Sequence, residues 1–410
     1  MRAKAFRERF RLRSRGTLSR IVVLIGICCV VQLSVAWAAE WSLLPSIGVK
    51  GVYNDNLILT PLPHNETYGF WVTPAAEFAG KTERFEVSSR TAVDFVSYYG
   101  GEETQYTNVF LPLTLRYKTE KDLLGFSGGF TRDNTLMSEL LTTGVVLRFT
   151  QRNQWTANPS WTRSITEKLS VQSGFQLNDT TYNNGVSLGL VDYQLFGGSG
   201  GLLYQLTEQD QIQLTGSYVN FHTTNGLAPF RASFPGVNLS LTHAFTDTLT
   251  GTAYGGPRFV SSSTQTVTDN IKAQNTVWLF GASLTKKLES TSIHVNMDRD
   301  IVPSGFGLLI QRDRAGLTVS HDLTETLAAS FNGSGFLVSG ITDVAQGGNI
   351  PDSRYFNLTP KVTWKFSEWW KADVSYTYGW RDTDNSIDSA SSNGTMFMLT
   401  YYPPKLAFSN

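Results

Sequence analysis

Charged side chains at alternate positions are the residues of this sequence whose types and spacing could act on a solute. In the stretch Ile293–Ser320, a hairpin would place Asp298 and Asp300 across from Arg312 and Arg314. Carboxylates opposite guanidiniums can form ion pairs that stiffen a wall, and they can also line a constriction that selects anionic or sugar solutes. The sequence leaves both interpretations open.

The sequence contains few signs of a catalytic site or a metal site. The five histidines are scattered along the chain, and the usual nucleophile, phosphate-loop, zinc-protease and dinucleotide motifs do not occur. We therefore predict no enzyme activity, no catalytic residues, no metal site and no cofactor. The formal net charge of zero also argues against a nucleic-acid partner, because nucleic-acid-binding proteins usually carry a basic excess.

The elements that must position the charged residues are β-strands, because apolar and polar residues alternate along almost the whole chain. Residues 109–117 read VFLPLTLRY, in which Val109, Leu111, Leu113, Leu115 and Tyr117 share one face. Each such strand has one apolar and one polar face. After residue 40 the sequence has no apolar run long enough to form a transmembrane helix.

A turn signal, in which Thr or Ser is usually followed by an acid, recurs about every forty residues. The acids of the repeat are Glu83, Glu120, Glu167, Glu208, Asp247, Glu289, Glu325 and Glu368. Forty residues accommodate two strands, one short turn and one longer connection. Prolines recur before several of these turns, at Pro74, Pro112, Pro159 and Pro360, and predict bulges or bends in those strands.

The longer connections are expected in polar segments rich in Gly, Asn and Ser, so that short turns and long loops alternate strictly. These segments are Asn54–Thr67, Thr180–Leu190, His222–Ser233, Ser261–Ala273, Thr342–Ser353 and Asp382–Asn393. Eight turns joining sixteen strands, with one more strand at each end, predict an all-β fold: a transmembrane antiparallel up-and-down β-barrel of about 18 strands (range 16–18). Strands of about ten residues tilted by ~40° rise roughly 25 Å, the height of an outer-membrane apolar band. The alternative is a soluble β-sandwich, propeller or β-helix, although those folds rarely alternate turn lengths so regularly.

If the apolar phase of the strands faces lipid, the polar phase lines the lumen. The charged residues assigned to the lumen are Glu86, Arg90, Asp94, Arg116, Arg258, Asp298, Asp300, Arg312, Arg314, Asp373 and Arg381. Amphipathic residues three positions before the turns are predicted to form an interfacial girdle. They are Arg163, Tyr204, His243, His321 and Trp364. Aromatic residues in or beside the expected loops could stack on sugars, namely Tyr68, Phe70, Phe221, Phe230 and Phe234.

The first 38 residues have the three parts of a secretory signal peptide. Eight basic residues precede Ile21, an apolar run extends to Val35, and Ala36-Trp37-Ala38 offers a cleavage site. A membrane anchor is the alternative, although the apolar run is short for a spanning helix. Cleavage would leave residues 39–410 as the barrel and remove both cysteines. It would also change the net charge from zero to −7, since 26 basic residues (34 − 8) would remain against 33 acids (34 − 1).

The start of the expected barrel resembles a known family. Val52-Tyr53-Asn54-Asp55-Asn56-Leu57 follows the first strand and Thr73-Pro74 opens the next. This arrangement is similar to outer-membrane β-barrel porins that are often encoded with exopolysaccharide or exosortase (PEP-CTERM) gene clusters. One departure is the end, where Tyr401-Tyr402 is followed by Pro403-Pro404 and six further residues. Either Tyr402 closes the last strand and leaves a free tail, or the assembly machinery recognises Phe408.

The resemblance implies a role in exporting extracellular polysaccharide, as a pore or an accessory, in the outer membrane of a Gram-negative bacterium. Both termini are expected in the periplasm. Outer-membrane lipid, the barrel assembly machinery and polysaccharide-export components are the expected partners. A general or sugar-selective diffusion porin is the first alternative, and an outer-membrane lipid hydrolase is the second.

Overall fold

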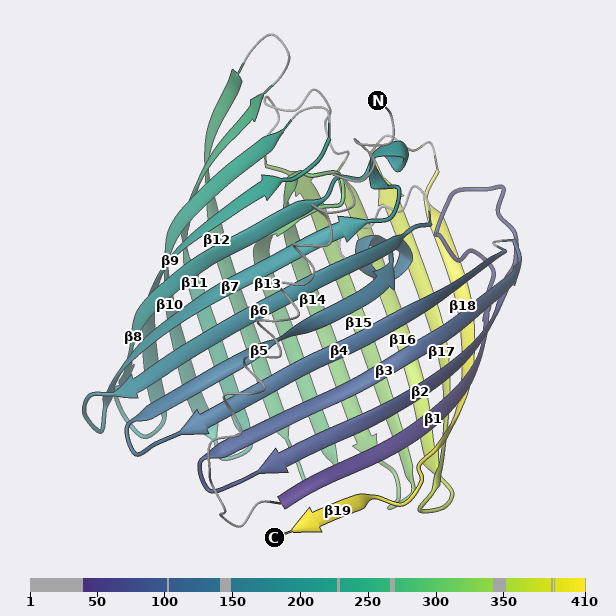
Figure 1. The fold of residues 1–410 in the computed structure, drawn as a ribbon, viewed down its shortest axis with the longest axis horizontal. Coiled ribbons are helices and arrows are strands. Elements are labelled where there is room, and N and C mark those ends of the chain that lie inside the picture. The colour runs from purple at the N-terminus through teal and green to yellow at the C-terminus, as the bar shows by residue number, and fades with distance from the viewer. Residues whose placement is uncertain are drawn as a thin grey trace, which may run out of the picture.

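The structure, a computed structural model, describes residues 40–101, 103–140, 149–226, 229–265, 270–341, 352–384, 386 and 388–409. They form one closed antiparallel sheet (Figure 1). Eighteen wall strands each pair with the next along the chain, and the last of them, β18, returns to pair with β1. The prediction of an 18-stranded antiparallel barrel is confirmed. Closure gives every wall strand a partner on both sides, which removes the edge strands that an open sheet would leave.

The wall strands are β1 (Glu40–Asn54), β2 (Thr67–Lys81), β3 (Phe85–Gly100), β4 (Thr104–Lys118), β5 (Asp122–Asn134), β6 (Gln151–Ser164), β7 (Leu169–Tyr182), β8 (Tyr193–Gln205), β9 (Asp210–Thr223), β10 (Phe230–Thr246), β11 (Leu249–Gln265), β12 (Asn270–Lys287), β13 (Thr291–Pro303), β14 (Leu309–Asp322), β15 (Leu327–Gly340), β16 (Ser353–Lys365), β17 (Trp370–Thr383) and β18 (Ala390–Tyr401). Two short helical segments, η1 (Leu136–Leu140) and η2 (Gly185–Leu188), lie in connections between strands. A short strand, β19 (Leu406–Ser409), follows the last wall strand.

The repeated Thr or Ser of the sequence closes the short turns at one end of the barrel, called here the short-turn end. The hydroxyl of Thr82 accepts a hydrogen bond from the backbone N–H of Phe85 at 2.9 Å, and Thr119 and Thr324 do the same for the residue three positions later. A side chain that satisfies the backbone in this way stabilises a tight turn. Both ends of the described chain lie at this end, because Glu40 pairs with Lys81 and with Ser409.

The opposite, long-loop end departs from the strict alternation that we expected. Only residues 101–103 join β3 to β4, and only residues 304–308 join β13 to β14. Strands extend into both ends of the expected loops His222–Ser233 and Ser261–Ala273, and β11 and β12 extend beyond their neighbours at the upper left of Figure 1. In β11 the alternate residues Val260, Ser262 and Thr264 are 1 to 5% exposed, so the strand keeps a buried inner face up to its end.

The strand prolines do not create the bulges that we expected. The pairs Val72↔Phe95 and Ala75↔Ala92 lie on either side of Pro74 and keep one register, and the register is also unchanged across Pro159 and Pro360. A proline removes one ladder donor. Each of these prolines therefore interrupts the hydrogen bonds between two strands, but the side chains on either side of it keep the same alternation between the two faces.

The C-terminal tail completes the wall. Pairing of β18 with β1 covers Ile47–Asn54, and β19 then pairs with Glu40–Leu43, placing Phe408 opposite Trp41. The alternative of a free tail is therefore wrong. Pro403-Pro404 interrupts the last strand because proline has no backbone N–H to donate, and pairing resumes beyond it.

None of the helices in the described part of the chain has the length and hydropathy needed to cross a bilayer. The expected signal peptide, residues 1–38, lies outside the described residues.

Candidate functional site

Successive positions of each strand point to opposite faces of the wall, which we call the outer and inner phases. The outer phase carries large exposed apolar side chains, among them Phe95, Leu239, Trp278 and Val374, each more than half exposed. An apolar surface that encircles a protein is unfavourable in water and matches the hydrocarbon of a bilayer. The residues between them form the inner phase, which faces the lumen.

The β13–β14 hairpin holds three Arg–Asp pairs in consecutive register positions. Arg312 donates to Asp300 from Nε at 3.2 Å and from Nη2 at 2.7 Å, and Arg314 donates to Asp298 at 3.1 and 3.0 Å. Val295 and Met297 are exposed on the outer phase of β13, and Asp298 and Asp300 occupy the alternate positions. Both pairs therefore lie on the inner phase.

The third pair of this hairpin lies between the other two and on the outer phase. Arg299 donates to Asp313 at 2.5 and 2.7 Å, and its guanidinium lies 5.0 Å from the ring centroid of Phe280. Two charge-assisted hydrogen bonds from each guanidinium hold it in a fixed orientation. The hairpin therefore presents two ordered ion pairs on the inner phase and one on the outer phase.

The other charged residues that the sequence assigned to the lumen also fall on the inner phase. Asp94 accepts from Thr73 at 2.8 Å, and Asp373 accepts from Thr363 at 2.6 Å and pairs with Lys371 at 3.1 Å. Glu86 is 3.5 Å from Lys81, and Arg258 donates to Ser217. The remaining members of the set are Arg90, Arg116 and Arg381. The inner phase thus carries charges of both signs on strands from many parts of the wall.

The residues assigned to the girdle lie on the outer phase at the short-turn end. His243 contacts Asp210 at 2.7 Å, His321 contacts Thr291 at 2.8 Å, and Arg163 lies 3.7 Å from Asp122. The other two members, Tyr204 and Trp364, are 44% and 52% exposed. Side chains with a polar tip and an apolar body suit a membrane–water boundary.

Sequence reasoning missed an inward segment between β5 and β6. Its helical turn η1 reaches the connection between β13 and β14, where the Glu139 carboxyl accepts a hydrogen bond from the Gly305 N–H at 3.1 Å. The same carboxyl accepts a hydrogen bond from the hydroxyl of Tyr182, at the end of β7, at 2.5 Å. Leu136 and Leu140 pack against the inner phase near Ile310. This turn is visible as a coil within the outline of the barrel in Figure 1. Burial raises the pKa of the Glu139 carboxyl above its usual range.

Apolar side chains occupy much of the inner phase at the long-loop end. Phe221, Phe230 and Phe234 are between 1 and 6% exposed and belong to one buried cluster. Our interpretation of these three as loop residues that could stack on sugars is therefore wrong. Tyr68 and Phe70, half exposed on the outer phase of β2, do not lie in a loop either.

The Asn54-Asp55-Asn56 motif forms hydrogen bonds across the seam of the barrel, the place where the first wall strand pairs with the last. The Asp55 carboxylate accepts from the backbone N–H of Asn393 at 2.7 Å and from its side-chain amide at 2.8 Å. Asn56 donates to the Ser391 carbonyl at 2.9 Å and is 1% exposed. The following loop residue, Leu59, is buried in the same apolar cluster as Leu140. The motif that carried the family resemblance thus has a structural role at the seam.

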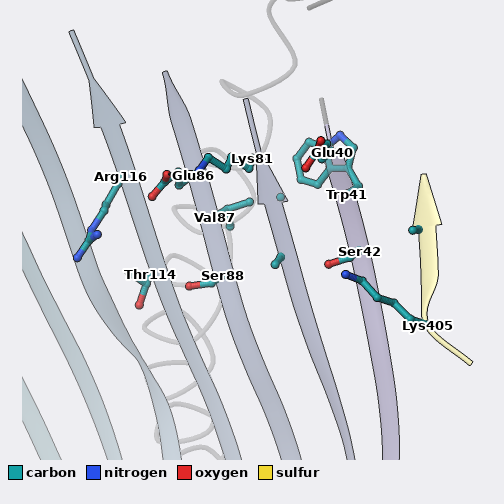
Figure 2. Close-up of a pocket in the computed structure, with 13 residues that line it drawn as sticks. Glu40, Trp41, Ser42, Lys81, Glu86, Val87, Ser88, Thr114, Arg116 and Lys405 are labelled. Carbon is teal, nitrogen blue, oxygen red and sulfur yellow. Dashed lines mark ion pairs between the residues drawn. The ribbon is translucent and has the colours of Figure 1, made fainter. Parts of the chain in front are cut away.

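A cavity of about 690 Å³ lies at the short-turn end, on β1 to β4 and β19. Figure 2 shows Lys81 beside Glu86 and Lys405 extending from the tail toward Ser42. Arg116 also lines the cavity, and within the described residues neither Arg116 nor Lys405 has an ion-pair partner. The cavity is therefore lined by charged side chains of both signs.

No group of three or more His, Cys, Asp or Glu side chains in the described part of the chain is arranged to hold a metal ion. No protein-family model and no curated protein matches the chain.

Solved structures that resemble it include OccK5 (OpdH) of Pseudomonas aeruginosa, with 13% identity, a TM-score of 0.43, and coverage of 90% of this chain and 98% of that one. OccAB3 of Acinetobacter baumannii has 11% identity and a TM-score of 0.43, with coverage of 90% and 99%. The ferric citrate transporter FecA has 10% identity and a TM-score of 0.48, with coverage of 85% of this chain and 61% of FecA.

Proposed function

We propose that the protein is an outer-membrane channel through which small polar and charged solutes diffuse. The observation that carries this proposal is the β13–β14 hairpin. Its two inner-phase ion pairs, Asp298–Arg314 and Asp300–Arg312, face the lumen of a barrel whose outer phase is apolar. An 18-stranded barrel is wide enough for water, and hydrated charge pairs on its wall favour polar solutes over apolar ones.

The apolar outer phase supports placement in a bilayer. In β10, Val237, Leu239 and Leu241 follow one another on the outer phase and are 49, 55 and 45% exposed. The amphipathic girdle lies at the end of this band, as expected at a membrane boundary. Together with the expected signal peptide, the closed barrel favours the outer membrane, with the short-turn end in the periplasm. Outer-membrane lipid and the barrel assembly machinery are the partners that this placement implies.

The inward turn η1 favours small solutes over a polymer. Glu139 connects it to Gly305 in the β13–β14 connection, and Leu140 packs into a buried cluster, so the turn narrows the lumen at the long-loop end. A polysaccharide would need a continuous wide path. Export of an extracellular polysaccharide therefore remains a prediction from the family resemblance, and the geometry favours the diffusion-channel alternative.

Solute flux into liposomes tests the proposal. Purified protein is reconstituted, and swelling is recorded with neutral sugars, sugar acids and long oligosaccharides of matched osmolarity. We expect swelling with the small solutes and a steep decline with chain length. An assembled barrel that admits none of these solutes would refute the proposal, and equal passage of long chains would favour polymer export. Lipid hydrolysis in the same liposomes would instead support the hydrolase hypothesis.

A further inference from the structure

The outer phase changes from apolar to basic where β9 to β12 approach the long-loop end. Strand register aligns one cross-strand row of His222, Arg231, Ser263 and Lys272. The next row toward the short-turn end is Asn220, Ser233, Ser261 and Gln274. Beyond it the outer phase becomes apolar again, with Tyr218, Phe259 and Trp278 each more than half exposed. A basic row, a hydroxyl-and-amide row and an aromatic surface thus follow one another down the same four strands.

These two polar rows line a groove of about 580 Å³ on the outside of the barrel. None of its lining residues is acidic. Arg231 and Lys272 are both exposed, and within the described residues neither has a hydrogen-bond or ion-pair partner. The nearest acid in the same cross-strand row is Asp179, two strands beyond His222. The groove is therefore positively charged, and the N–H groups of the Arg231 and Lys272 side chains can donate hydrogen bonds to a ligand.

The height of the groove matches the outer boundary of a membrane. His222 lies twelve residues after Asp210, the first residue of β9 at the short-turn end. At ~3.3 Å per residue and a tilt of ~40°, this separation corresponds to a rise of about 30 Å. An outer-membrane apolar band is about 25 Å tall. The basic row thus lies just above the band, at the level of lipid headgroups.

The opposite face of these strands keeps the groove in a fixed orientation. Phe221, Ala232 and Val260 alternate with the groove residues and are buried in the inner cluster, at 1 to 5% exposure. The His222 ring also packs edge-on against Phe196 at 6.0 Å. Because the inner face is packed, the basic side chains remain directed outward.

We propose that this groove binds the phosphate-bearing headgroup of a glycolipid in the outer leaflet. Arg231 and Lys272 lie two strands apart, which is about 10 Å, with Ser263 between them. A phosphate over Ser263 is within reach of both cations, and the hydroxyl and amide row can donate to sugar oxygens. The acyl chains of the same molecule lie against Tyr218 and Trp278. This continuity with the apolar band favours a membrane lipid over a soluble polyanion.

Binding of a diphosphorylated glycolipid to the detergent-solubilised full barrel tests the site. Native mass spectrometry gives the occupancy of the glycolipid, of its enzymatically dephosphorylated form, and of a soluble sulfated oligosaccharide. The test variant is Arg231→Gln with Lys272→Gln. The matched control is Arg354→Gln, an exposed outer-phase arginine near Asp382 on another part of the wall. We expect the dissociation constant for the phosphorylated lipid to rise at least tenfold in the test variant and to stay within twofold in the control.

Three results would overturn the site: equal binding of the phosphorylated and dephosphorylated lipids, no change in the test variant, or tighter binding of the soluble polyanion. Retention of heat-modifiable migration in gels shows that each variant is folded. The inference rests on the membrane placement proposed above. Recovery of the protein from the soluble fraction would refute that placement, whereas a folded barrel that ignores the lipid phosphate would refute only this site.

Discussion

Removing the two inner-phase guanidiniums of the β13–β14 hairpin should make the channel more cation-selective. The substitutions are Arg312→Ala and Arg314→Ala, which leave Asp300 and Asp298 without the partners that now lie at 2.7 and 3.0 Å. The inner phase of the hairpin then changes from balanced to a net charge of −2. The effect on permeating ions follows from Coulomb's law.

A unit charge about 10 Å from a permeating ion in water contributes about 0.4 kcal/mol, so two charges contribute about 0.8 kcal/mol. Cations gain this energy and anions lose it, a difference of about 1.6 kcal/mol, or roughly 15-fold in the cation-to-anion permeability ratio at low salt. At 0.1 M salt the Debye length is about 10 Å, which reduces the difference to about 0.6 kcal/mol and the ratio to about threefold.

Reversal potentials in planar bilayers under a salt gradient measure this ratio directly. The control is Arg299→Ala with Asp313→Ala, which removes the outer-phase pair of the same two strands and should leave the reversal potential unchanged. An unchanged reversal potential in the Arg312/Arg314 variant, or an equal shift in both variants, would refute the assignment of these residues to the lumen.

Three further predictions concern the inward turn, the seam and the contact between β1 and β2. The buried Glu139 has a raised pKa in the folded state, so its contribution to docking of η1 is present below the pKa of the undocked carboxyl and is lost as the pH rises through the folded value. Wild-type conductance should therefore increase as the pH rises through the raised pKa of Glu139, and Glu139→Gln should abolish this dependence. Asp55→Ala removes two charge-assisted hydrogen bonds from Asn393 at the seam, and we expect a loss of about 2 kcal/mol in urea unfolding in detergent. Gly80→Leu would push a side chain into the Trp41 ring on the neighbouring strand, and we expect a cost of about 2 kcal/mol from overpacking in the same assay.

Matched variants separate these effects from general instability. A Cβ added at Gly51 in β1 would meet no atom within 4 Å, so Gly51→Ala should change the unfolding free energy by less than about 1 kcal/mol. Glu66→Gln alters a carboxylate in the same loop as Asp55 that accepts a hydrogen bond from the exposed Tyr68 hydroxyl, and should leave the seam intact. Conductance of wild-type protein that does not change with pH would contradict the role of Glu139.

The wall could be predicted from the sequence because each strand pairs with its neighbours along the chain. Under that topology the local turn signal sets the connections: Thr82 and Thr119 close their turns through contacts only three residues long. Local sequence also determines which face of the wall a charged residue occupies. Asp300 and Arg312, for example, are opposite each other once the register of their hairpin is set. Whether those residues select solutes stays a prediction.

The inward features could not be predicted, because their partners are distant in the sequence. Glu139 contacts Gly305, 166 residues away, and Asn56 contacts Ser391 across the seam. No local pattern distinguishes Leu136–Leu140 from a solvent-exposed loop, because the apolar wall that buries it is built by β14 to β16. The polar composition of Ser261–Ala273 indicated a loop, because the sequence does not show which residues of other strands bury one face of this segment. The apolar side chains of the cluster next to this segment lie on β9, β10 and β12.

Thiol modification of single-cysteine variants in a planar bilayer tests the central claim most directly. The chain has two cysteines, Cys28 and Cys29, both within the expected signal peptide, so introduced cysteines at 312 and 313 would be the only reactive positions of the cleaved protein. We predict that a charged, water-soluble thiol reagent reduces the current stepwise in Arg312→Cys and leaves the current in Asp313→Cys unchanged. Equal effects at both positions, or an assembled barrel without any current, would contradict a water-filled lumen lined by the inner phase.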